Sequence, residues 1–527
     1  MRAIAWLFEG TLDPPGHLWP RWIFLRALGA IYFSAFYSLA SQDRGLIGPD
    51  GILPAGNYLD AVARALGPWQ RLAFAPTVLW WSSGPLALKA LCFVGMVASL
   101  FIVLNIWPRG ALALAFVCFL SFVAAAQDFS GYQSDGMLLE AGFLALFFAP
   151  RGRWPGLGRG QPPSRASLYL LRWEWFRIYF ESGAVKLLSG DPEWRNFTAM
   201  DEYYQNGPLP TWIGYYVQHL PHAFHAATVG ATLALELGLV FMMFLPRRFR
   251  FACFLIATCW QLAVVLTANY AFLNYLVMAL GVLLLEDRPA ESVLPAKPAE
   301  TGTPRPEPGA EAIVGHFGER LRRRWRVLRL SVCAVALGWV GYATAAQLAW
   351  LFVRVPIPLL PVTAIAPLRI ANQYGLFAVM TRGRYEIEFQ GSTDGQDWVA
   401  YPFRYKPQAL DQPPRIYAPY QPRLDWNLWF ASLGSWRDHS IVPNIEVRLL
   451  QNDHDVLELF AENPFARDAP RVIRVFLWRY WFTSLSDHRE TRRWWRRELL
   501  GLYAPTIERT QAGEFKIVEW PTVGPHD

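Results

Sequence analysis

Over its first two thirds the chain alternates long apolar stretches with short polar loops. Such stretches are long enough, or nearly so, to cross a membrane as helices. They occur at about residues 22–40, 84–106, 110–126, 136–149, 168–188, 223–245, 250–267, 270–285 and 327–353. The pattern therefore predicts a polytopic α-helical membrane protein with about nine spans.

From about residue 374 the pattern changes. Residues 385–392 alternate apolar and polar side chains, which is typical of a strand with one face in water. The dipeptide Asp394-Gly395 favours a hairpin, and residues 398–405 would be the return strand. The other elements predicted here are strands at 445–450 and 471–482 and a short helix at 455–465. We expect a mostly-β or α+β domain outside the membrane.

Three loops carry arginines next to apolar stretches, at residues 150–165, 246–250 and 319–326. Basic loops tend to stay in the cytoplasm, and nine spans put all three loops on that side. The N-terminus is then cytoplasmic and the C-terminal domain extracytoplasmic. The predicted domains are a helical membrane bundle at 1–288, a disordered cytoplasmic linker with a basic segment at 289–326, a last span at 327–353 and the extracytoplasmic domain at 354–527.

Composition supports a membrane protein, since 53% of residues are hydrophobic and only 17% are charged. The net charge of +7 comes largely from loops that adjoin apolar spans, so we predict membrane lipids rather than nucleic acid as partners. No phosphate-binding loop, dinucleotide fingerprint or metal-ligand spacing is present. We therefore expect neither a cofactor nor a metal.

Ionisable and amide side chains lie at membrane depth, where they are costly and usually have a role. Glu174, Arg177 and Glu181 would share one face of a helix. This face is either a charge-paired stripe towards the bundle interior or the wall of a polar cavity. The predicted polar bundle core consists of Asp135, Glu140, Glu174, Arg177, Glu236, Asn269 and Asn274.

Lys186 lies near the outer end of the same predicted span. It could extend its ammonium group to the interface, or it could be a desolvated lysine that acts as a general base. In the second case Glu181 and Asp191 would line a pocket beside it. That alternative is an integral-membrane enzyme acting on a lipid or quinone-like substrate.

Residues 418–434 form an aromatic cluster in which Arg423 and Asp425 could pair. The cluster is either a buried structural corner or an exposed recognition surface. The candidates for contact with a partner, or between domains, are Trp194, Arg195, Arg423, Asp425, Trp426, Trp429 and Phe430.

These motifs resemble the lipase maturation factor family. The resemblance rests on QSDGMLLEAGFLALFFAP from Gln133, SGAVKLLSGDPEWR from Ser182, LTANYAFLNYL from Leu266, NQYGLFAVMTRGRYEIEFQ from Asn372 and APYQPRLDWNLWFASLG from Ala418. The chain departs from the family pattern at Ser134, Tyr204, Asn206 and Ala268.

The resemblance implies a non-enzymatic, chaperone-like membrane protein that assists the folding and assembly of secreted dimeric lipases. In animals such proteins are expected in the endoplasmic reticulum, where the lumenal C-terminal domain engages the client. Short, arginine-rich loops point to a bacterial homologue in the inner membrane.

A weaker likeness links Gly183, Lys186 and Trp194 to the transmembrane domain of vitamin K-dependent γ-carboxylase. That family uses a membrane-embedded lysine as a base. The likeness implies that Lys186 could serve as a base here as well.

Overall fold

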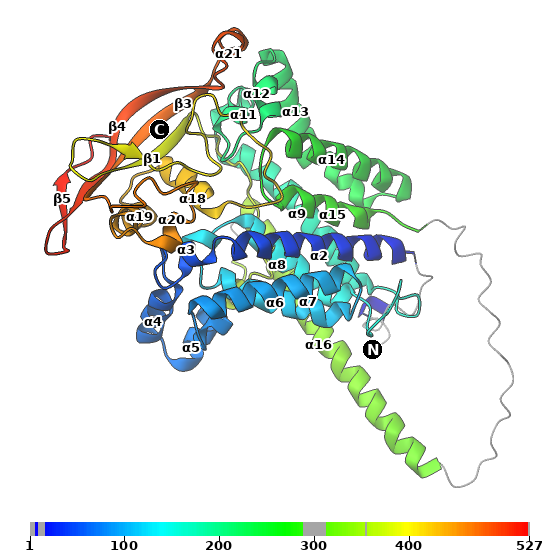
Figure 1. Ribbon diagram of the computed structural model, residues 1–527. Coiled ribbons are helices and arrows are strands. Elements are labelled where there is room, and N and C mark those ends of the chain that lie inside the picture. The colour runs from blue at the N-terminus through cyan, green and yellow to red at the C-terminus, as the bar shows by residue number, and fades with distance from the viewer. Residues whose placement is uncertain (1–5, 9–15, 288–311, 354–355, 525–527) are drawn as a thin grey trace.

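The computed structural model describes residues 6–8, 16–287, 312–353 and 356–524. Every apolar stretch predicted from the sequence is helical (Figure 1). The helices are α2 (Leu18–Ala40), α6 (Pro85–Val103), α7 (Pro108–Val123), α8 (Gln133–Phe148), α9 (Arg165–Leu188), α13 (His222–Leu237), α14 (Arg247–Thr267), α15 (Leu273–Gly281) and α16 (Ala312–Phe352).

Among the described residues, five helical segments are long and apolar enough to cross a membrane. They are Leu18–Ala40, Pro85–Val103, His222–Phe244, Arg247–Thr267 and Arg323–Phe352. The segment His222–Phe244 combines α13 with the 3₁₀ turn η4 (Leu239–Phe244). Helix α9 is as long as these spans, but its charged residues lower its hydropathy. Helix α15 is shorter and ends in the 3₁₀ turn η5 (Val282–Leu284).

Short helices lie at the end of the bundle near the C-terminal domain, some beside the sheet and others near the ends of α6 and α7 (Figure 1). They come from the segments that follow α2 and α9. These helices are α3 (Asp43–Ile47), α4 (Ala55–Ala65), α5 (Pro68–Phe74), α10 (Pro192–Arg195), α11 (Tyr203–Asn206) and α12 (Trp212–Gln218).

The C-terminal domain is built on one antiparallel sheet of five strands in the order β2-β1-β3-β4-β5. Its strands are β1 (Arg384–Ser392), β2 (Val399–Ala400), β3 (Val472–Phe482), β4 (Trp495–Arg509) and β5 (Phe515–Glu519). The register pairs Ile387 of β1 with Leu477 of β3, and both side chains are buried. The helices of this part are α17 (Leu360–Ile365), α18 (Arg423–Ser432), α19 (Ile441–Leu450), α20 (His454–Leu457) and α21 (Leu485–Thr491).

Two strand predictions are confirmed and others are not. The predicted strands at 385–392 and 471–482 match β1 and β3. The predicted strand at 445–450 is wrong, because these residues belong to helix α19. Ile441, Ile445 and Leu449 are buried at helical spacing, which a short apolar run cannot reveal unambiguously.

The predicted return strand at 398–405 shrinks to the two residues of β2. Pro402 has no backbone N–H for the ladder, which helps to end the strand there. Strands β4 and β5 were not predicted. The predicted helix at 455–465 is reduced to the short α20.

The predicted linker falls mainly on residues 288–311, which lie outside the described residues. The basic segment at 319–326 is helical, because α16 begins at Ala312 and continues without a break into the predicted last span.

Among the described residues, one large hydrophobic cluster extends from the bundle into the C-terminal domain, and smaller clusters lie beside it. It joins Leu28 and Leu139 of the bundle to Ile387, Leu428 and Ile473 of the domain. The two parts are therefore packed together through a shared interior.

Candidate functional site

Between α17 and β1 the chain runs in an irregular conformation against α8 and α9. Residues 372–383, here named the junction segment, form neither helix nor strand. Their backbone N–H and C=O groups therefore lack the partners that regular structure supplies, and buried groups of this kind must be paired elsewhere.

Side chains of α9 supply several of these partners. The Tyr374 N–H donates to Glu181 Oε2 at 2.7 Å, and the Leu376 N–H donates to Ser182 Oγ at 3.2 Å. Lys186 Nζ donates to the Leu376 carbonyl at 3.0 Å. The polar face of α9 thus binds the backbone of the junction segment.

An ion pair between α8 and α9 holds the start of the segment. Arg177 pairs with Glu140, and both side chains are buried. Arg177 Nη1 donates to the Asn372 carbonyl at 2.6 Å. Glu140 Oε2 accepts from the Asn372 N–H at 2.9 Å and from the Tyr374 hydroxyl at 2.9 Å. A charged oxygen that accepts several hydrogen bonds makes a strong anchor.

The loop after α9 binds the end of the segment. Asp191 Oδ2 accepts from the Met380 N–H at 2.7 Å, and Trp194 Nε1 donates to the Phe377 carbonyl at 3.0 Å. Asn206 Nδ2 donates to the Thr381 carbonyl at 2.9 Å. With nine spans and a cytoplasmic N-terminus, the loops near 41–80, 127–135 and 189–222 are predicted to face outside. The last of these loops is therefore part of the same junction.

A second buried ion pair joins α8 to α18. Arg423 donates to both oxygens of Asp135, at 2.8 and 2.9 Å, and none of these side-chain atoms is exposed. Gln42, which lies just after α2, binds backbone groups beside this ion pair. It donates to the Gln421 carbonyl at 2.9 Å and accepts from the Arg423 N–H at 2.8 Å.

Asn269 forms hydrogen bonds that join the turn before α15 to the loop before α18. Its side-chain amide donates to the Arg415 carbonyl at 2.8 Å and accepts from the Tyr417 N–H at 2.7 Å. Asn274 instead stays within the bundle, where it donates to Gln261 at 2.6 Å.

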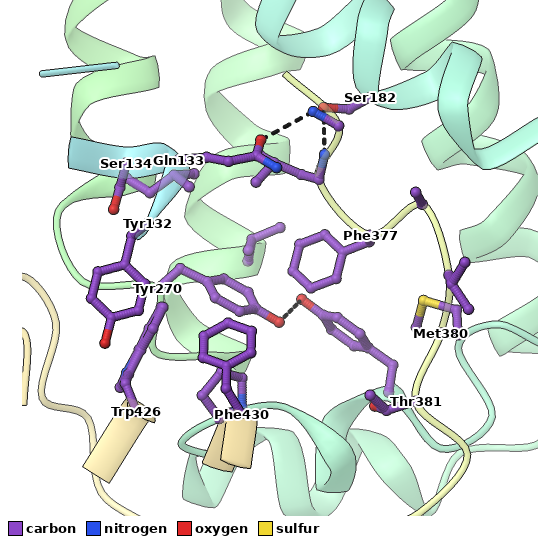
Figure 2. Close-up of a pocket in the computed structure, with 18 of the residues that line it drawn as sticks. Tyr132, Gln133, Ser134, Ser182, Tyr270, Phe377, Met380, Thr381, Trp426 and Phe430 are labelled. Carbon is purple, nitrogen blue, oxygen red and sulfur yellow. Dashed lines mark hydrogen bonds between the residues drawn. The ribbon is translucent and has the colours of Figure 1, made fainter. Parts of the chain in front are cut away.

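A cavity of about 810 Å³ lies at this junction, between the bundle, the junction segment and α18 (Figure 2). Its walls are mainly aromatic and apolar, with a few polar groups. Figure 2 shows Tyr270 pointing towards a second tyrosine ring with a hydrogen bond between them, and that partner is Tyr203, at 2.9 Å. Pockets of about 300–1,000 Å³ are the usual size for binding small molecules.

Phe377 stands at the centre of the cavity wall. Its backbone has a positive φ of 57°, a conformation that non-glycine residues rarely adopt. Its ring contacts those of Tyr203 and Tyr270, with centroid distances of 5.9 and 5.1 Å. The hydrogen bond from Trp194 to its carbonyl helps to hold this backbone in place.

The structure separates the predicted residues into two groups. Those that line the cavity are Lys186, Trp194, Glu236, Asn274, Trp426, Trp429 and Phe430. Those outside its lining are Asp135, Glu140, Glu174, Arg177, Glu181, Asp191, Arg195, Asn269, Arg423 and Asp425. The stripe Glu174, Arg177 and Glu181 is buried in the bundle and does not form a cavity wall.

The predicted pair of Arg423 with Asp425 is not formed. Arg423 binds Asp135, whereas Asp425 Oδ1 accepts from the Lys406 N–H at 3.0 Å. Burial raises the pKa of Asp425 to about 6, although the Lys406 N–H opposes this rise. Most of the aromatic cluster is a structural corner, since Trp426 and Trp429 are buried and only Phe430 is exposed.

Sequence reasoning missed several residues of the junction. Asn372 and Tyr374 both donate to Glu140, and Gln42 accepts from the Arg423 N–H. Arg384, fully buried at the start of β1, donates to the carbonyls of Gln205, Gly207 and Pro208. No local spacing reveals such contacts. Only the motif from Asn372 marked part of this region.

Comparison with known proteins agrees with this arrangement. Residues 19–292 match the lipase maturation factor transmembrane domain, and residues 370–505 match the lipase maturation factor C-terminal domain. The second match begins just before the junction segment. No solved structure matches the chain significantly.

Curated relatives align over nearly the whole chain. Lipase maturation factor 1 of Bos taurus is 32% identical over 96% of this chain and 92% of its own length. Lipase maturation factor 2 of Rattus norvegicus is 30% identical over 93% of this chain and 83% of its own length. Human lipase maturation factor 1 is 30% identical over 98% of this chain and 94% of its own length. With both domains matched in order around one shared junction, the chain belongs to the lipase maturation factor family.

Proposed function

We propose that this protein is a membrane-bound maturation factor that assists the folding or assembly of secreted proteins, with lipases as the client class. The observation that carries the proposal is the full-length similarity to proteins named lipase maturation factors 1 and 2. The two matched domains share a large hydrophobic cluster, so the C-terminal domain packs against the bundle.

Our candidate for the client-binding surface is the exposed edge of the 810 Å³ cavity, here named the mouth. Three apolar side chains that line it are also exposed, namely Phe377 at 36%, Val379 at 66% and Phe430 at 41%. An incompletely folded client exposes apolar side chains, which this aromatic mouth could bury. Trp426 and Trp429 support the mouth from inside rather than contacting the client directly.

For the membrane arrangement we propose about nine spans, a cytoplasmic N-terminus and an extracytoplasmic C-terminal domain in a bacterial inner membrane. The equivalent membrane in animal relatives would be that of the endoplasmic reticulum. Support comes from hydrogen bonds, since the loops predicted outside contact the C-terminal domain through Gln42, Phe129 and Gln205. The basic loop at 150–165 instead contacts the start of α2 through Arg21.

The enzyme alternative is not favoured. Lys186 borders the cavity, but its ammonium group lies 2.8 and 3.0 Å from the oxygens of Glu236 and also bonds to the Leu376 carbonyl. A general base needs an uncharged amine with a free lone pair, which this ion pair disfavours. Glu181 and Asp191 accept backbone N–H groups and do not line the cavity.

Phe430→Ser and Val379→Ser should each reduce client maturation by about fivefold, as expected when an interface side chain is lost. The measurement is secreted lipase activity per amount of lipase, in cells that lack their own maturation factor. Val399→Ser is a matched control, because Val399 is 48% exposed on β2 and does not line the cavity. Equal losses in all three variants would refute the proposed surface.

Lys186→Met should destabilise the protein by about 3 kcal/mol, because it leaves the Glu236 carboxylate buried without its partner. Adding Glu236→Leu should restore most of the stability. Thermal unfolding of the detergent-solubilised protein measures this effect. The double variant should also keep its maturation activity. A stable double variant without activity would instead support chemistry at Lys186.

The topology predicts opposite labelling of two exposed loops. In a chain without its five native cysteines, Arg159→Cys should react with an impermeant maleimide only from the cytoplasmic side. Gln396→Cys should react only from the outer side. Reaction of both from the same side would contradict the five spans, or any odd number of spans, between residues 159 and 396.

A further inference from the structure

Exposed apolar side chains are concentrated between α5 and the start of α6. They are Trp69, Leu72, Phe74, Trp81 and Leu86, and we name this group the α5 surface. Trp69, Trp81 and Leu86 are 84%, 88% and 83% exposed, and none of the residues of α5 is buried. Exposed apolar patches usually mark a surface that contacts a partner or a membrane.

Hydrogen bonds hold this segment at the ends of two bundle helices. The Thr77 hydroxyl donates to the Ser121 carbonyl at 2.8 Å, and the Val78 N–H donates to Ser121 Oγ at 3.1 Å. Ser121 lies in the last turn of α7, and α6, which is long and apolar enough to cross a membrane, begins at Pro85. Figure 1 shows α4 and α5 near these ends of α6 and α7. The α5 surface therefore lies where α6 would leave the lipid.

The exposed side of α6 continues the α5 surface towards the membrane. Leu86, Phe93 and Leu100 are all exposed, and they recur at every seventh position, which is about two turns of a helix. They therefore lie along one side of α6. Acyl chains that cover this side would reach Leu86, which belongs both to α6 and to the α5 surface.

The charges near the α5 surface suit a lipid surface. The sequence has no aspartate or glutamate from residue 61 to residue 127. Arg64 and Lys89 are exposed, and the Arg71 guanidinium lies 5.0 Å from the centre of the Trp80 ring. Tryptophan, phenylalanine and leucine combined with arginine and lysine are typical of helices that lie in the membrane–water interface.

We propose that the α5 surface inserts into the membrane–water interface. Its apolar side chains lie among the upper parts of the acyl chains, and the neighbouring basic side chains lie at the phosphate groups. A helix of seven residues is too short to cross the membrane, so α5 lies along the surface. The partner is the lipid surface itself and not a protein client.

This contact would support the C-terminal domain from the membrane. The segment before α5 binds that domain, because Asn444 Nδ2 of α19 donates to the Ile52 carbonyl at 3.1 Å. Gly45 of α3 packs so closely against α20 that an added Cβ would lie 2.3 Å from the Asp455 carbonyl oxygen. Residues 43–86 therefore connect α19 and α20 to the lipid surface.

Spin labels test the insertion in the full-length chain, purified without a client and placed in nanodiscs of phosphatidylcholine with a minor fraction of phosphatidylglycerol. In a chain without its five native cysteines, one label is attached to Leu72→Cys. The control label is attached to Gln396→Cys, in an exposed loop of the C-terminal domain. Power-saturation electron paramagnetic resonance compares collisions with oxygen, which concentrates in acyl chains, with collisions with a water-soluble nickel complex.

The ratio of oxygen to nickel collisions should be about tenfold higher at position 72 than at position 396. Equal ratios at the two positions would overturn the proposal. A ratio at position 72 that rises only after an unfolded secreted lipase is added would also overturn it, because the partner of the α5 surface would then be a client.

A pair of substitutions tests whether the neighbouring side chains hold the label in lipid. Trp69→Ser with Phe74→Ser should lower the ratio at position 72 by about threefold, without a change in unfolding temperature, because both side chains are exposed. Phe515→Ser with Trp520→Ser is the matched control, because it removes two exposed aromatic side chains from the C-terminal domain. An equal response of the label to both pairs would contradict the proposal.

Discussion

Backbone N–H and C=O groups that are buried away from water must find hydrogen-bond partners within the protein. The junction segment has no helix or strand to provide them. Its N–H and C=O groups are bound instead by Glu140, Glu181, Lys186 and Asp191. This requirement explains why charged residues persist in otherwise apolar helices. Their role is to hold an irregular connection in a fixed path.

The same constraint determines how the C-terminal domain is placed on the bundle. The junction segment leads directly into β1, so fixing its path also fixes the sheet. Asp135 and Arg423 add a second, independent attachment through α18. The cavity therefore lies between two attachments of the C-terminal domain to the bundle.

The length of the apolar stretches predicted the helices correctly, because a long hydrophobic segment in a membrane has few conformations other than a helix. Alternation likewise predicted β1, and the strand predicted at 471–482 matches β3. The strand prediction at 445–450 failed, because Ile445, Val447 and Leu449 fit either a strand or a helix and only packing decides. The buried charges were predicted as costly groups, but their partners were not. Tyr374 is separated by 193 positions from the Glu181 carboxylate that binds it, and no local pattern encodes that contact.

Hydrogen exchange at the junction segment tests the central claim most directly. In the full-length protein in detergent, the amides of Tyr374, Leu376 and Met380 should exchange far more slowly than those of the exposed loop at 466–468. Replacing Glu181 with alanine should speed exchange at Tyr374 before the rest of the segment is affected. Exchange at all three amides as fast as in the exposed loop would contradict the account.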